Sequence, residues 1–130
     1  MKQILFTAAI LILLGSCQKK DDTAPDPAQV TFQISNPAAG QTFRKGDTIF
    51  INATVNYISE LHGYDLSLIN AADQSVLFED QQHVHSDHFT ISNYWVDTLS
   101  RPTDITLKLT TEIDHAGHEA TKTVSIHSQP

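Results

Sequence analysis

The sequence is poor in sulfur: it has one cysteine, Cys17, and one methionine, Met1. A single cysteine excludes a disulfide within the chain, so a secreted domain with this sequence must be stabilised by its hydrophobic core. Because no cysteine or methionine follows Cys17, that domain also offers no soft sulfur ligand for Cu(I).

Positive charge is also scarce, with 8 Lys and Arg residues against 15 Asp and Glu residues and a formal net charge of −7. Nucleic acids and anionic lipid headgroups are therefore not expected as partners, because binding them requires clusters of Lys and Arg. The sequence contains neither a Gly-x-Ser-x-Gly nucleophile motif nor a phosphate-binding glycine loop. We therefore do not expect an enzyme.

The one long apolar run lies at the N-terminus, from Ile4 to Leu14, and follows the basic residue Lys2. It is too short to cross about 30 Å of hydrocarbon, which needs about 20 helical residues, and is typical of a signal peptide. The run ends in Leu14-Gly15-Ser16-Cys17, which resembles the lipobox of bacterial lipoproteins. The resemblance implies cleavage of residues 1–16 and attachment of lipid, including palmitate, to Cys17. An ordinary signal peptide is the alternative.

Residues 17–29 are expected to comprise the lipidated Cys17 and a flexible tether, because Pro25 and Pro27 interrupt a segment without apolar periodicity. The charged run Gln18-Lys19-Lys20-Asp21-Asp22 resembles the tether that follows the lipidated cysteine in many lipoproteins of the Bacteroidota. The resemblance implies a lipid anchor in the outer membrane and display at the cell surface, with the periplasmic face as the alternative.

Residues 30–130 alternate apolar and polar residues in short segments separated by turn residues, which predicts β-strands. They predict an all-β, seven-stranded immunoglobulin- or fibronectin-like β-sandwich, with strands at 30–35, 48–55, 64–68, 76–78, 89–96, 105–113 and 124–126. Two segments resemble the opening and the closing hairpin of bacterial Ig-like and fibronectin-type modules, namely 34–47 and 114–124. The whole chain resembles small, His-containing Ig-like surface lipoproteins of the Bacteroidota, which implies a fold and no activity.

All seven histidines follow residue 60, and the expected topology brings six of them to one end of the sandwich. Because chain direction alternates from strand to strand, the connections before the third strand, after the fourth and after the sixth meet there. These connections hold His62, His83, His85, His88, His115 and His118, whereas His127 falls at the opposite end. His83-Val84-His85 places two rings on the same side of an extended segment. Asp87 and Asp114 are nearby carboxylates, available either to ligate an ion or to orient a ring.

Imidazole and carboxylate groups are ligands for Zn(II) and Cu(II), so the six histidines predict a divalent-metal site on a surface module. One alternative is a pH-responsive histidine surface. Another is a non-catalytic adhesion or accessory module that binds a protein partner or glycan through Tyr57, Tyr64, Tyr94 or Trp95, although Trp95 is expected in the core. His83-Val84-His85 also resembles part of the copper site of copper-zinc superoxide dismutase, but the rest of that enzyme's pattern is missing.

Overall fold

The computed structural model describes residues 25–130 of the 130-residue chain. Cys17, the apolar run before it and the charged run after it lie outside the described residues, so the lipid anchor stays a prediction. Within residues 25–130, no helix is long and apolar enough to cross a membrane.

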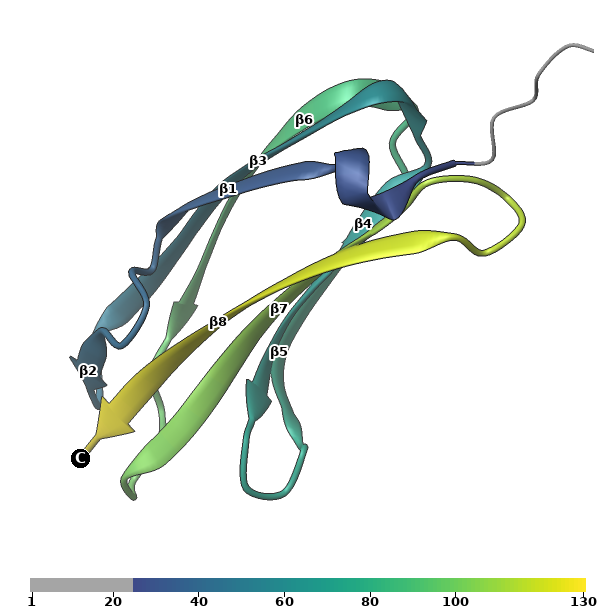
Figure 1. Ribbon diagram of the computed structural model, residues 1–130. Helices are drawn as coiled ribbons and strands as arrows, with labels where there is room; N and C mark the ends of the chain where they lie inside the picture. The colour runs from purple at the N-terminus through teal and green to yellow at the C-terminus, as the bar shows by residue number, and fades with distance from the viewer. Residues whose placement is uncertain (1–24) are drawn as a thin grey trace, which may run out of the picture.

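The described residues form eight strands and one short 3-10 helix, which Figure 1 shows as two facing layers of strands. In chain order the elements are η1 (Pro27–Gln29), β1 (Thr31–Asn36), β2 (Thr42–Arg44), β3 (Thr48–Leu61), β4 (Gly63–Asn70), β5 (Val76–Gln82), β6 (Ser86–Val96), β7 (Thr103–Glu112) and β8 (Glu119–Gln129).

One sheet has the order β1-β3-β6 and the other has the order β2-β8-β7-β4-β5. All neighbouring strands are antiparallel except β2 and β8, which are parallel. The strand after β4 pairs with β4 itself and does not join the β1-β3-β6 sheet, unlike the corresponding strand of a constant-type immunoglobulin domain. The all-β expectation is therefore confirmed, in the form of a fibronectin-like β-sandwich.

The expected number of seven strands is wrong, because the structure contains an additional strand, β2. Its three residues are too few to show a period-2 pattern, and they lie between Gly40 and Gly46, which indicate turns. The strand forms because Thr42–Arg44 pair with His127 to Gln129 of β8, and this pairing buries the side chain of Phe43 in the core.

The core lies between the two sheets, where the alternation directs every second side chain. On β3, the side chains of Ile49, Ile51, Ala53 and Val55 are buried, and their neighbours in sequence face outward. The same pattern on the other strands buries Leu66, Leu68, Phe89, Ile91, Ile105, Leu107, Leu109 and Ile126. The strongest alternations in the sequence therefore mark the core.

Three of the four aromatic residues considered as contacts pack against this core instead. Tyr57, Tyr64 and Trp95 are half-buried, and the Tyr64 ring stacks on Phe89 with centroids 5.3 Å apart. Burial and the hydrogen bond that its hydroxyl donates to Asp80 raise the pKa of Tyr64 to about 12. Only Tyr94 is largely exposed, with 62% of its surface accessible.

Several strands are longer than the sequence predicts, so the connections at one end of the sandwich are short. We call this end the upper pole. β3 runs to Leu61 and β4 begins at Gly63, so that His62 alone connects them. Residues 83–85 connect β5 to β6, and residues 113–118 connect β7 to β8. In Figure 1 the β7–β8 connection and the 3-10 helix lie at this same end.

The last residues of the expected flexible tether, 17–29, are ordered in the structure. Pro27–Gln29 form a turn of 3-10 helix, and the carboxylate of Asp26 caps it by accepting a 2.9 Å hydrogen bond from the backbone of Ala28. The backbone N–H of Asp26 also donates to the Tyr57 hydroxyl at 3.3 Å. The chain thus enters the domain along the upper pole.

Gly63 allows the closest backbone approach at this pole. Its φ is +144°, and a Cβ atom on it would lie 2.4 Å from the carbonyl oxygen of Gln82 and 3.2 Å from the Cα of His83. A side chain would therefore push the end of β5 away from β4. Gly117 and Gly40 also have positive φ, but a Cβ atom on either would meet nothing within 4 Å.

We predict that Gly63→Ala lowers the free energy of unfolding by more than about 2 kcal/mol, because backbone strain and a clash with backbone atoms add together. Gly40→Ala is the matched control and should cost about 1 kcal/mol, since it introduces strain alone. Urea unfolding followed by circular dichroism measures both. Equal losses for the two variants would contradict the close approach of β4 and β5.

Candidate metal centre

Four histidine rings meet at the upper pole. The β3–β4 and β7–β8 connections supply one ring each, and the β5–β6 connection supplies two. The centroid of His62 lies 4.1 Å from that of His115 and 4.9 Å from that of His85. The centroids of His83 and His85 are 4.7 Å apart. We call His62, His83, His85 and His115 the His cluster. The expected convergence of the loops thus places four of the six predicted site residues in one group.

His85 is the central member of the His cluster because both of its ring nitrogens have partners. Its Nδ1 lies 2.9 Å from Oε1 of Glu60, and its Nε2 lies 2.9 Å from Nε2 of His83. A carboxylate accepts a hydrogen bond, so Nδ1 carries the proton and the lone pair of a neutral ring is on Nε2. Two nitrogens bound to one Zn(II) at 2.0–2.1 Å cannot be more than about 4 Å apart, and this pair meets that limit.

His62 contributes a nitrogen that nothing in the described structure satisfies. Its Nδ1 is buried and has no hydrogen-bond partner among the described residues. Leaving such an atom unpaired costs about 1–3 kcal/mol. The backbone holds the residue in place, because its N–H donates to the carbonyl oxygen of Glu112 at 2.9 Å. An ion or a proton donor at Nδ1 would remove this penalty.

Glu60 is the site residue that the sequence analysis missed. It lies near the end of β3, in a part of the strand that extends past the expected limit at residue 55. A signal was present, since Glu60 and His62 are two residues apart and an extended segment directs such side chains to the same side. The hydrogen bond with His85, and more weakly the charges of His85, His62 and His115, lower the pKa of Glu60.

Glu60, His62 and His85 together offer three donor atoms that all lie within 4.8 Å of one another. One carboxylate and two imidazoles suit Zn(II), Cu(II) or Ni(II). The Nε2 of His83 lies 2.9 Å from that of His85, but His83 is not one of the three residues whose donor atoms converge. The geometry therefore fits a single ion held by three side chains.

Two predicted histidines at this end, His88 and His118, make none of the ring contacts of the His cluster. The Nδ1 of His88 is 2.6 Å from Asp87, and the Nδ1 of His118 is 2.7 Å from Asp114. The two aspartates thus orient rings, one of the two roles expected for them. His127 lies apart from the pole, as expected, with its Nδ1 2.6 Å from Asp104.

These contacts also affect the carboxylates. The hydrogen bond with His88 lowers the pKa of Asp87. Burial alone would raise the pKa of Asp114, but hydrogen bonds from the backbone and ring of His118 and from the backbone of Ala116 outweigh it and lower the pKa. Each of these two histidines therefore makes a hydrogen bond with a different carboxylate.

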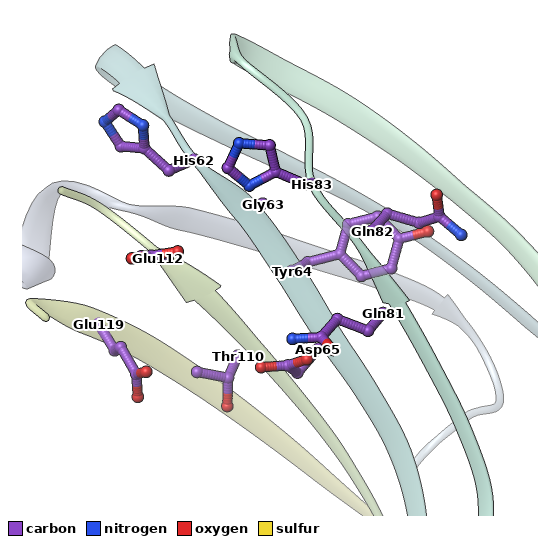
Figure 2. Close-up of a pocket in the computed structure, with 10 residues that line it drawn as sticks. All are labelled: His62, Gly63, Tyr64, Asp65, Gln81, Gln82, His83, Thr110, Glu112 and Glu119. Atoms are coloured by element: carbon purple, nitrogen blue, oxygen red, sulfur yellow. The ribbon is translucent and has the colours of Figure 1, made fainter. Parts of the chain in front are cut away.

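His62 lines two hollows of the surface. Figure 2 shows the first, of about 110 Å³, with His62 and His83 at one end beside Gly63 and the carboxylates of Glu112 and Glu119 farther away. The second, of about 390 Å³, is lined by His62, Glu60 and Tyr57 together with Gln29 of the 3-10 helix and the two residues before that helix. Both hollows therefore adjoin residues of the His cluster.

No protein-family model matches the chain, and no curated protein matches it. Among solved structures, it is similar to fibronectin(III)-like modules of Clostridium thermocellum CbhA, with 16% identity, a TM-score of 0.49 and coverage of 76% of this chain and 96% of that one. It is also similar to the sporulation control protein Spo0M from Bacillus subtilis, with 9% identity, a TM-score of 0.55 and coverage of 78% of this chain and 49% of that one. At such identities a likeness concerns the fold alone.

The contact between Glu60 and His85 predicts a pH titration. Because the hydrogen bond favours the ionised carboxylate, Glu60 should release its proton below the ordinary pH for glutamate, and the contact should be lost only as the pH falls through that lowered value. Carbon-13 NMR of the glutamate carboxyl groups measures the midpoint. In the His85→Ala variant the midpoint for Glu60 should rise toward the ordinary value for glutamate. An unchanged midpoint would show that the contact between Glu60 and His85 is absent.

Proposed function

We propose that this domain binds one divalent transition metal ion, Zn(II) or Cu(II), at the His cluster. One observation carries the proposal: donor atoms of Glu60, His62 and His85 lie within 4.8 Å of one another, and the buried Nδ1 of His62 has no hydrogen-bond partner among the described residues. A histidine nitrogen that is buried without a partner is a ready ligand, because binding replaces an unfavourable state of the free protein.

The residues divide into two roles. His62 and His85 are the proposed imidazole ligands, and the rings of His83 and His115 pack against them. Glu60 either ligates the ion directly or accepts the Nδ1 proton of His85 and so directs Nε2 toward the ion, as carboxylates do in many zinc sites. His88 and His118, which the sequence predicts as ligands, are not ligands in this proposal.

We further propose that the domain is attached through lipid on Cys17 to the outer membrane and faces the cell surface. The support is the sequence Leu14-Gly15-Ser16-Cys17 and the charged run after it. The described chain enters the domain at the upper pole, so a short tether would hold the metal site near the membrane. There the site would buffer or deliver the ion, or join the domain to a protein partner through it.

Isothermal titration of the purified protein with Zn(II) and Cu(II) at pH 7.5 tests the metal site. Cys17→Ser is included throughout, because a free thiol would compete for the ion. We expect one ion per chain, and at least a hundredfold weaker binding in the double variant His62→Ala, His85→Ala.

The matched control is the triple variant His88→Ala, His118→Ala, His127→Ala, which removes three histidines that each have their own aspartate. It should bind as tightly as the unsubstituted protein. A loss in the control equal to that in the double variant would mean that surface histidines bind without a defined site, and no binding at all would leave a module that works without metal.

Metal affinity should also depend on pH. Ligation requires neutral imidazole, and the free side chain takes up a proton near pH 6.5. Protons therefore compete with the ion below that pH, and with two imidazole ligands the apparent affinity should fall by up to about a hundredfold per pH unit. Titrations at pH 7.5, 6.5 and 5.5 measure this slope, and a flat profile would rule out imidazole ligands.

A further inference from the structure

The outer face of the β1-β3-β6 sheet differs from the rest of this acidic protein because it carries almost no charge. Neither Thr48 to Asn56 of β3 nor His88 to Val96 of β6 contains a Lys, Arg, Asp or Glu residue. The outer face of the opposite sheet is charged, with Asp65, Glu79, Lys108 and Glu119 around one hollow. The contrast shows that the two sides of the sandwich suit different surroundings.

Two aromatic side chains lie on this uncharged face, near the end that is farther from the upper pole. Phe50 of β3 and Tyr94 of β6 are directly opposite each other in the strand pairing, and 59% and 62% of their surfaces are exposed. Such cross-strand partners have Cβ atoms about 5 Å apart on the same face, so the two side chains are neighbours on the exposed surface. Val96, which is 44% exposed, extends it.

Hydroxyl and amide groups adjoin the aromatic pair. The next pairs toward the upper pole on the same face are Asn52 with Ser92 and Thr54 with Thr90. Each of these side chains both donates and accepts hydrogen bonds. We call Phe50, Asn52, Thr54, Ser92 and Tyr94 the neutral face.

We propose that the neutral face binds an uncharged polysaccharide. Sugar hydroxyls also both donate and accept hydrogen bonds, and the C–H face of a pyranose ring packs on an aromatic ring as other apolar surfaces do. A protein partner is less suitable, because about a quarter of protein residues are charged. The neutral face offers no opposite charge to pair with them, and burying an unpaired charge is costly. An acidic glycan would meet a chain of net charge −7. The chemistry of the face thus favours a neutral sugar chain.

Affinity gel electrophoresis tests the proposal with the purified Cys17→Ser protein in gels that contain a neutral β-glucan, xylan, galactomannan or soluble starch. EDTA is present, so the result does not depend on the proposed metal site. We expect at least one of these polymers to retard the protein, and the double variant Phe50→Ala, Tyr94→Ala to lose at least tenfold in affinity. Val76→Ala, which removes an equally exposed apolar side chain from β5 (57% exposed), should be retarded like the unsubstituted protein.

A gel that contains polygalacturonate, an acidic polymer, is run beside the neutral ones. Three results would overturn the proposal: no retardation by any neutral polymer, retardation only by polygalacturonate, or equal retardation of the double variant. Sedimentation velocity adds a further outcome. If the protein forms a dimer that the double variant disperses, while no neutral polymer retards it, then the neutral face is an interface between two copies of the chain.

Discussion

The position of the site depends on how tightly His62 is held between two buried residues. Leu61 is fully buried at the end of β3, and Gly63 is buried at the start of β4, where only a glycine fits against the end of β5. With its neighbours fixed in this way, His62 has no freedom to leave the pole. The other loops then bring His85 and His115 to its ring, since antiparallel strands return their connections to the same end.

Carboxylates divide the histidines of this protein into two groups. His88, His118 and His127 each make a close contact with one aspartate on the surface. In the His cluster a single carboxylate, Glu60, contacts the ring of His85, and the buried Nδ1 of His62 has no partner among residues 25–130. Surplus nitrogen donors in one place, and not the total number of histidines, are what make the pole suitable for an ion.

The sequence predicted the sandwich and the convergence of the loops, because period-2 patterns identify strands and antiparallel topology then fixes which connections meet. It did not reveal β2, whose three residues form a strand only through pairing with β8. It also left open which rings touch, since that depends on side-chain direction within each loop. His88, for example, continues the β6 strand and bonds to Asp87, a choice that spacing alone does not determine.

X-ray absorption at the zinc edge, on protein loaded with one equivalent of Zn(II), shows directly which atoms bind the ion. A site built on the His cluster predicts at least two imidazole ligands, recognised by their outer-ring scattering, with Zn–N distances of about 2.0–2.1 Å. The imidazole signal should vanish in His62→Ala, His85→Ala. A spectrum of oxygen ligands alone, with no imidazole contribution, would contradict the account and show that the four rings meet for a reason other than metal.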